Sequence, residues 1–312
     1  MDENQTYGVA DMTDNIFKIG QYLLFPNRSN SRHNGGDTDT SIRAIDAHLG
    51  VEYNCKILSI EQFHQYMILL DQLPAHPSIN RIVQVVLGRR YAYLFYDRHC
   101  DDLYSYIRKN GCINEEDCLS IFRQIVQVVA HCHKHGIILN DLKLRKFLFM
   151  DTNRDTIVID GLEDGCILVD PNDKPSIKHR CPAYVAPEML QPGGYYSSKS
   201  ADIWSLGVMF YTMVVGKYPF QDTDPNKLFE KIRNCTYDLP DTISAKSKCL
   251  IKALLRLQPE QRLTAEAILQ HPWLYAKSFT FYTPINLIDR KGSDQTVPDS
   301  LMSDDDNTLY HP

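Results

Sequence analysis

The spacing of apolar residues changes once along this 312-residue chain, and the change limits the folds open to it. Up to about residue 97 the apolar residues form short runs typical of β-strands, as in the hairpin-like segment 82–97. Farther on they recur at three- and four-residue intervals, which predicts an amphipathic helix over 118–135. The rest reads as mostly helical up to about Trp273. The sequence therefore predicts an α+β fold, with a strand-rich part and a larger helical part that meet near 98–101.

Turn-forming residues divide the strand-rich part. Ile16–Phe25 reads as one strand, the polar segment 27–41 as a mobile loop, and 42–60 as further strands. Gly88 is the predicted hairpin turn, and the short helix between these strands should stop at Pro74.

Both ends of the chain differ in composition from the middle. Residues 1–15 are polar and lack the apolar core of a signal peptide. After Tyr275 the composition shifts to Ser, Asp, Thr and Pro. We therefore expect flexible tails at 1–15 and 276–312, and one folded domain over 16–275.

Charge and hydropathy argue against two classes of partner. The formal net charge of −6 disfavours general binding to nucleic acid. No apolar run reaches the roughly 18 residues of a membrane-spanning helix, and the longest, Leu206–Val215, suits a buried core helix. Nine scattered cysteines suggest reduced thiols inside a cell.

Six short motifs occur in an order shared with protein kinases, and they span about 16–275. Any one is a weak signal, but six in order at kinase spacing leave little room for chance. They are CKIL (55–58), AHPSI (75–79), LNDLKLRKF (139–147), APE (186–188), DIWSLG (202–207) and PEQRLTAEAILQHPWL (259–274).

A narrower resemblance rests on NDLKLRKF, CPAYVAPE, ILQHPWL and the tail string DQTVPDS, which together resemble the Tribbles pseudokinase family. This resemblance implies a bilobal protein kinase-like fold with a small strand-rich N-lobe and a larger helical C-lobe. It also implies an adaptor or scaffold rather than an enzyme.

The parts that hold nucleotide phosphates in a kinase are incomplete. No G-x-G-x-x-G string lies between residues 16 and 56, and Gly35 and Gly36 fit a flexible turn better than a phosphate contact. Lys56 is retained in CKIL, where a kinase lysine pairs with a helix glutamate. Here the only acid in 62–75 is Asp71. Two interpretations stay open: Lys56 keeps a weak ATP-binding role with Asp71 as its partner, or it closes a strand with an exposed ammonium.

The metal-binding positions are also altered. The D-F-G position falls on Gly161-Leu162-Glu163, so the metal-binding carboxylate is replaced by a glycine. Asp160 lies one residue earlier, and a shift of one residue on a strand reverses its face. Lys146 stands at the second metal-ligand position, where its positive charge repels magnesium. We therefore expect no metal and no ordinary Mg-ATP chemistry.

Degenerate remnants of the catalytic loop remain at Asp141 and Lys143. Asp141 has the position of the catalytic base, or it holds the loop through backbone hydrogen bonds. Lys56, Lys143 and Lys146 offer weak, metal-independent neutralisation of a triphosphate. Asn140 replaces the arginine that anchors a phosphorylated activation loop, so regulation by that route is not expected.

The framework residues of the kinase pattern are kept. Glu188 and Arg262 should form a buried structural ion pair. Asp202 should cap the following helix and bond to the backbone near the catalytic loop, and Trp204 should lie in the core.

A histidine- and cysteine-rich helix end suggests zinc at first sight: His131, Cys132, His133 and His135. The glutamate expected beside His131 is missing, and the segment resembles the helix end of many kinases. We interpret it as structural.

The tail string supplies a ligase-docking candidate at Asp294, Gln295, Val297 and Pro298. It resembles the motif by which Tribbles proteins dock on a WD-repeat ubiquitin ligase. The residue before a proline is conformationally restricted, so binding costs less ordering entropy. The alternative is a solvated tail. We also expect the tail to couple to the pseudo-active site.

The segment 268–274 has two interpretations: a contact for a MAP kinase kinase, or core residues that close the domain. The family resemblance further implies a substrate peptide from a C/EBP-type bZIP transcription factor, an effect on MAP kinase signalling, and a nuclear and cytoplasmic location. The alternatives are a weak metal-independent Ser/Thr kinase that uses Lys56 and Asp141, and an allosteric regulator of an active kinase.

Overall fold

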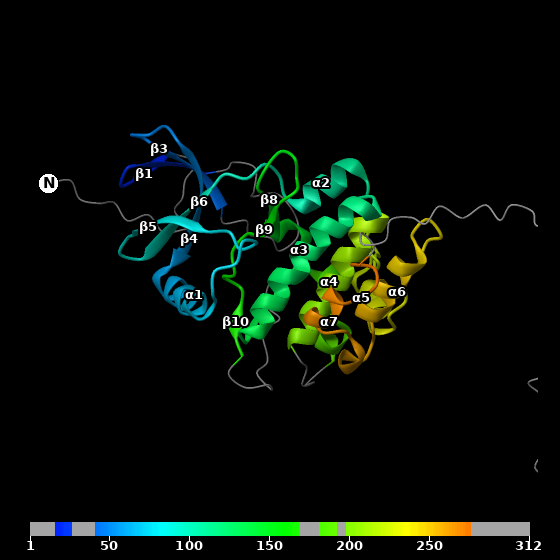
Figure 1. Cartoon of the computed structure of the whole chain (residues 1–312). Coiled ribbons are helices and arrows are strands. Elements are labelled where there is room, and N and C mark those ends of the chain that lie inside the picture. Colours follow the sequence, from blue (N-terminus) through cyan, green and yellow to red (C-terminus); the bar gives the residue numbers. More distant parts are fainter. Residues whose placement is uncertain (1–15, 27–40, 169–180, 192–197, 276–312) are drawn as a thin grey trace, which may run out of the picture. The chain divides into compact units, whose positions relative to one another are not determined.

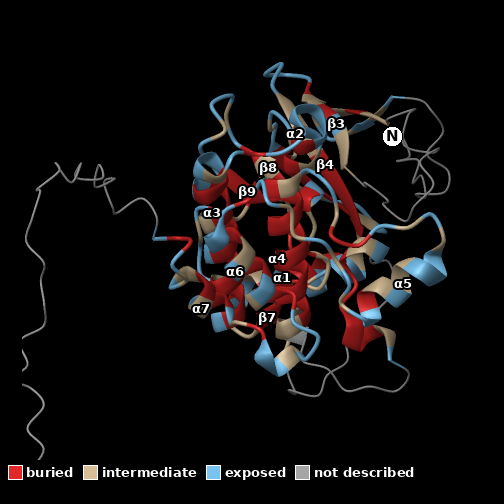
Figure 2. Cartoon of the chain, turned by 90° about the vertical axis from the view of Figure 1, so that its right-hand side faces the viewer, coloured by how far each residue is buried: buried red, intermediate tan, exposed pale blue. Residues whose placement is uncertain are grey.

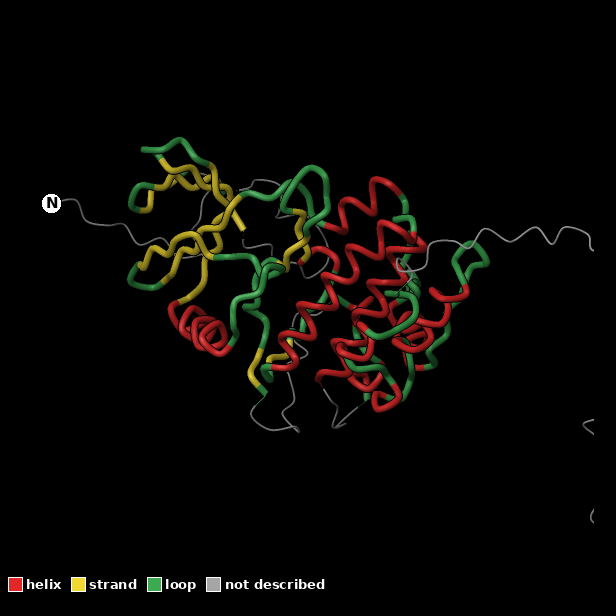
Figure 3. Tube along the Cα trace, in the orientation of Figure 1, coloured by secondary structure: helices red, strands yellow, loops and turns green. Residues whose placement is uncertain are grey.

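The computed structural model describes residues 16–26, 41–168, 181–191 and 198–275. The chain divides into two compact units, Met1–Tyr275 and Ala276–Pro312, and all the described residues belong to the first. Gly35, Gly36 and the predicted docking residues of the tail lie outside the described residues. Within the first unit, a sheet with one helix is followed by a group of helices (Figures 1 and 3).

The N-lobe is a six-stranded sheet in which neighbouring strands are antiparallel, in the order β1-β2-β3-β4-β6-β5. The predicted first strand over Ile16–Phe25 is wrong: it is two strands, because Gly20 takes a positive φ of 56° and reverses the chain. The hairpin with its turn at Gly88 is confirmed. The strands are β1 (Phe17–Ile19), β2 (Tyr22–Phe25), β3 (Ser41–Asp46), β4 (Glu52–Ser59), β5 (Ile82–Leu87) and β6 (Tyr91–Asp97).

One helix, α1 (Ile60–Gln72), packs against β4 and β6. Ser59 caps it in a capping box with Gln62, and it ends two residues before Pro74, as predicted. Successive side chains of β4 point to opposite faces of the sheet. Cys55 belongs to the smaller of the two hydrophobic clusters, on one face, and Lys56 points to the other face. The alternation therefore places the Lys56 side chain on the face of the sheet opposite to that of Cys55.

The C-lobe begins after β6 ends at Asp97, which agrees with the predicted junction. The prediction of a mostly helical chain after residue 135 is wrong for 137–167. Four strands of two or three residues form two antiparallel pairs there, β7 with β10 and β8 with β9. The elements are α2 (Leu103–Asn110), α3 (Glu115–Lys134), β7 (Ile137–Ile138), β8 (Phe147–Phe149), β9 (Ile157–Ile159), β10 (Cys166–Ile167), α4 (Ser198–Val215), α5 (Pro225–Arg233), α6 (Ala245–Leu254) and α7 (Ala265–Leu269), with 3-10 turns at Leu144–Lys146, Pro182–Tyr184, Pro187–Leu190 and Pro259–Gln261.

The core of the C-lobe is built around α4 (Figure 2). Its residues 201–214 are all buried, which confirms the core helix predicted at Leu206–Val215. Trp204 is fully buried and stacks on Phe220 with 5.4 Å between ring centroids. Among the described helices none is long and apolar enough to cross a membrane. All nine cysteines lie in the described part, and none of them forms a disulfide bond there.

Candidate functional site

Lys56 is the central cation of the site and is only 5% exposed. Its Nζ lies 2.9 Å from Glu163 Oε1 and 3.2 Å from Asp160 Oδ2, and it donates a hydrogen bond of 2.8 Å to the Asp160 carbonyl. The ring of Tyr96 lies 5.5 Å from the same atom. Both interpretations of its surroundings fail: the ammonium is not exposed, and its partners are Glu163 and Asp160 rather than Asp71, which is exposed.

These contacts keep Lys56 charged. Burial alone disfavours the ammonium and lowers its pKa, but the carboxylates of Glu163 and Asp160 outweigh burial and raise the pKa of Lys56 above its ordinary value. Burial, and next the charge of Glu163, raise the pKa of the neighbouring Tyr66 phenol to about 12. The site therefore holds a permanent cation with a neutral phenol beside it.

The backbone after β9 places the two carboxylates. Lys146 directly precedes β8 and Asp160 directly follows β9, and the Asp160 N–H donates to the Lys146 carbonyl at 2.6 Å. Asn80 Nδ2 donates to Asp160 Oδ1 at 3.2 Å. Asp160 therefore reaches the site despite its one-residue offset, because the strand pair ends there and the chain turns.

Gly161 provides the turn, with a positive φ of 83°. A Cβ atom at this position would lie 2.7 Å from Lys56 Nζ and closer still to Glu163 Oε2. The position aligned with a metal-binding aspartate thus has no room for any side chain while Glu163 holds Lys56.

The remnants of the catalytic loop pair among themselves. Lys143 Nζ lies 2.9 Å from Asp141 Oδ2, and Lys146 Nζ lies 3.9 Å from the same oxygen. Lys146 also pairs with Asp164. Burial would raise the pKa of Asp164, but Lys146 and, to a smaller extent, Lys143 hold it below its ordinary value. The second metal-ligand position is thus filled by an ammonium that contacts two carboxylates.

Asp202 holds the backbone of the catalytic loop in place through hydrogen bonds. It accepts hydrogen bonds from the backbone N–H groups of Leu139 (2.9 Å) and Asn140 (3.0 Å), and its Oδ2 lies 2.9 Å from His133 Nε2. The predicted bonds to the catalytic-loop backbone are confirmed. The predicted helix cap is wrong, because α4 begins at Ser198 and Asp202 lies inside it. Asn140 takes a positive φ of 61° at this point.

Glu188 and Arg262 form the buried ion pair that the motifs predict. The guanidinium Nη1 and Nη2 atoms lie 2.7 Å from the two carboxylate oxygens, which is bidentate geometry. Arg262 also donates to the carbonyls of Ser200 and Arg256, both at 2.9 Å. The pair joins the 3-10 turn after Ala186 to the loop before α7.

The model of the protein kinase domain family matches residues 42–274. Tribbles homolog 2 of Canis lupus familiaris is 42% identical over 296 residues, which are 94% of this chain and 82% of that protein. Tribbles homolog 1 of Homo sapiens is 42% identical over 293 residues, 94% of this chain and 76% of that protein. This chain belongs to the Tribbles family. The bilobal protein kinase-like fold expected from the sequence is thereby confirmed.

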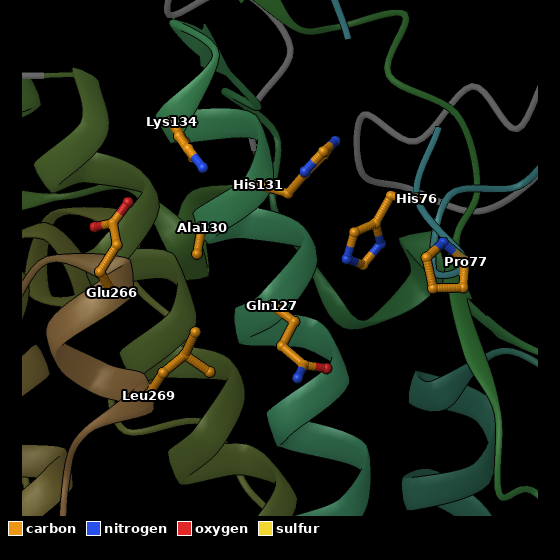
Figure 4. Close-up of a pocket in the computed structure, with 8 residues that line it drawn as sticks. All are labelled: His76, Pro77, Gln127, Ala130, His131, Lys134, Glu266 and Leu269. Carbon is orange, nitrogen blue, oxygen red and sulfur yellow. The ribbon is translucent and has the colours of Figure 1, made fainter. Parts of the chain in front are cut away.

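A pocket of about 380 Å³ lies away from Lys56 on this Tribbles chain, between the segment before β5, α3 and α7 (Figure 4). Two of its lining side chains, His76 and His131, face each other with 4.9 Å between ring centroids, and His135 lies 4.6 Å beyond His131. His131 Nε2 donates to the Pro74 carbonyl at 2.8 Å. Among the described residues no group of three or more His, Cys, Asp or Glu is arranged to hold a metal ion.

The segment 268–274 is largely core. Ile268, Trp273 and Leu274 are buried, and Trp273 packs edge-on against Phe210 with 4.6 Å between ring centroids. Three of the four apolar residues of this Tribbles motif therefore face inward, and the fourth, Leu269, is partly buried and lines the pocket.

The residue that the sequence analysis missed is Glu163. It was aligned with the glycine of D-F-G and not considered as a partner of Lys56, from which it is separated by 107 positions. The available signal was chemical. Glu163 stands where the motif has its glycine, and Gly161 stands two residues earlier, where the motif has its aspartate. Asn80 was missed because it lies just outside the motif at 75–79. His133 was interpreted as structural, and its contact with Asp202 agrees with that interpretation.

Proposed function

We propose that this Tribbles chain is a pseudokinase adaptor that brings a substrate to a ubiquitin ligase and transfers no phosphate itself. The observation that carries the proposal is the engagement of Lys56 by Glu163 and Asp160, together with an ammonium, Lys146, at a metal-ligand position. Phosphoryl transfer needs these positions to hold a nucleotide and magnesium. The framework contacts of Arg262 and Asp202 are meanwhile complete.

The proposed ligase contact is the tail string with Asp294, Gln295, Val297 and Pro298, recognised by a WD-repeat ubiquitin ligase. The proposed substrate is a bZIP transcription factor of the C/EBP type, held on the C-lobe. Two partners joined by one chain meet at a raised effective concentration, so the chain promotes ubiquitin transfer without chemistry of its own. No nucleic acid, membrane or metal takes part, and the site of action is the nucleus and the cytoplasm.

Modulation of MAP kinase signalling is the second part of the proposal. A MAP kinase kinase would meet the segment 268–274 through the exposed Gln270 and Pro272 and the partly buried Leu269, because the other apolar residues are in the core.

A quantitative pull-down from cell lysate tests the adaptor. The wild-type chain is compared with Val297→Ala/Pro298→Ala, and Asp299→Ala is the matched control in the same tail. Selective loss of a ubiquitin ligase from the double variant supports the proposal. An unchanged set of partners overturns it.

A weak, metal-independent kinase is the second candidate, because Lys56 and Asp141 are both retained and Lys143 lies beside Asp141. Asp141→Asn separates the two functions. It abolishes activity in a kinase, whereas ligase recruitment by an adaptor is unchanged. An allosteric regulator of an active kinase would instead depend on the face around Lys56 and survive loss of the tail.

A further inference from the structure

Three oxygens surround the ammonium of Lys56. Its Nζ donates hydrogen bonds to Glu163 Oε1 and to the Asp160 carbonyl, and Asp160 Oδ2 lies at an ion-pair distance of 3.2 Å. A lysine ammonium has three N–H donors, so these two hydrogen bonds use two of them. A phosphate oxygen would have to compete with these three oxygens for the ammonium. The Asp160 carbonyl is fixed by the backbone after β9, so the displaceable groups are the two carboxylates.

Glu163 is the less firmly held of the two. Asp160 has a second partner in Asn80, at 3.2 Å. Glu163 Oε2 is buried and has no hydrogen-bond partner among the described residues. A buried carboxylate oxygen without a partner costs free energy, so this side chain gains the most by moving.

The charges of the cluster also oppose an incoming anion. Lys56, Lys143 and Lys146 supply three positive charges. Four carboxylates, those of Asp141, Asp160, Glu163 and Asp164, pair with them, so the formal charge of the cluster is −1. Removing the charge of one carboxylate brings the cluster to neutrality. Lys56 then becomes available to an anion only if the neutralised carboxylate is one that contacts it.

We propose that Glu163 is an internal counter-ion that takes the place of a nucleotide phosphate on Lys56, and that it excludes nucleoside triphosphates from a site otherwise able to bind them without metal. Gly161 makes this possible by leaving the space that the Glu163 carboxylate fills. The contact ties the N-lobe sheet to the segment after β9 with no ligand present. The inference concerns the Lys56 site alone and does not depend on the ligase or substrate of the proposed adaptor.

The test is equilibrium binding of a fluorescent ATP analogue to the full chain in EDTA, followed by anisotropy. Three proteins are compared: wild type, Glu163→Gln and Asp164→Asn. Both substitutions neutralise one carboxylate of the cluster and keep its shape, but Asp164 contacts Lys146 and not Lys56. We expect Glu163→Gln to bind at least about tenfold more tightly than wild type, equivalent to roughly 1.4 kcal/mol. Asp164→Asn should stay within about threefold of wild type, or roughly 0.7 kcal/mol.

Two results would overturn the inference. One is equal binding by wild type and Glu163→Gln. The other is an equal gain in Asp164→Asn, which would mean that net charge alone controls binding. If Glu163→Gln does not unfold cooperatively, Glu163→Asp replaces it, because this variant keeps the charge and loosens the contact by one methylene. A gain over wild type then supports the inference, and no gain overturns it. The ligase pull-down is a separate readout, so either proposal can fail alone.

Discussion

Two buried pairs of a cation and a glutamate, one in each region of the molecule, differ in how completely they are satisfied. In the C-lobe, both carboxylate oxygens of Glu188 receive a donor from Arg262, and the remaining guanidinium donors reach backbone carbonyls. At the junction of the lobes, Lys56 uses one oxygen of Glu163 and leaves the other without a partner among the described residues. The Glu163 side chain is also more exposed, at 21% against 8% for Glu188.

The difference separates a permanent contact from a replaceable one. Removing one partner of a buried ion pair whose hydrogen bonds are all made strongly destabilises the folded protein, because the other charge stays buried. A carboxylate with one unpaired oxygen loses less when it moves, since water or a ligand can take its place. The Glu188–Arg262 pair therefore holds the shape of the C-lobe, and in our proposal the Lys56–Glu163 pair takes the place of a nucleotide contact.

Breaking the C-lobe pair should have the largest effect. Arg262→Ala leaves Glu188 charged and buried, so we expect the free energy of unfolding to fall by about 3–5 kcal/mol. Chemical denaturation followed by circular dichroism measures it. Lys248→Ala, which removes the half-buried partner of the exposed Asp241, is the control and should cost roughly 0–1 kcal/mol. Equal losses in the two variants would contradict the comparison.

Filling the space beside Glu163 should come next. Gly161→Ala places a Cβ against the Lys56–Glu163 pair and demands a left-handed backbone from an alanine, so we expect a loss of about 2–3 kcal/mol. In a Glu163→Ala background the clash with Glu163 is gone, and the backbone part and the close contact with Lys56 should remain, together about 1–2 kcal/mol. A double-mutant cycle from denaturation curves gives the coupling, and strictly additive losses would remove the link between positions 161 and 163.

Neutralising the interlobe pair directly should cost less. Glu163→Gln keeps the shape of the side chain, and Asp160 still balances Lys56, so we expect a loss of about 1–2 kcal/mol. Thermal unfolding in EDTA, with and without ATP, measures both the loss and its recovery on binding. A loss as large as that of Arg262→Ala would erase the distinction between the two pairs.

The smallest effect should come from His76, whose contact with α3 carries no formal charge pair. Burial, and then the neighbouring His131, lower the pKa of His76. As the pH falls below about 6.5, His76 therefore binds a proton in the unfolded chain before it does so in the folded chain. Stability should decrease with falling pH in that window, and His76→Gln should flatten the slope. Urea denaturation at pH 7 and at pH 5.5 measures the difference, with the exposed His64→Gln as the control.

The framework was predictable from sequence because its signals are local and strong. The α3 helix follows from long apolar periodicity and α4 from a long apolar run. The Glu188–Arg262 pair follows from two motifs whose residue types suit bidentate pairing. The strands between 137 and 167 were missed because two or three residues carry no measurable period. The cap predicted for Asp202 failed because α4 starts four residues before it.

The partners of Lys56 were not predictable in the same way. A kinase lysine takes its glutamate from the helix after its strand, and the acids available there, Glu61 and Asp71, are both exposed. The actual partner comes from the segment after β9, where a positive φ at Gly161 directs it inward. The positive φ at Gly161 and the length of the Glu163 side chain decide this contact. Neither can be read from the spacing or the composition of the sequence.

Gly161 also has a consequence for the history of the chain. An aspartate at this position is the single change that would restore a metal ligand, but it is obstructed while Glu163 holds Lys56. The substitution becomes tolerable only after position 163 has changed first. Position 163 must therefore change before position 161 can carry an aspartate, and the ammonium of Lys146 would still stand at the second metal-ligand position. The space between two side chains thus sets the order in which substitutions at 161 and 163 can be accepted.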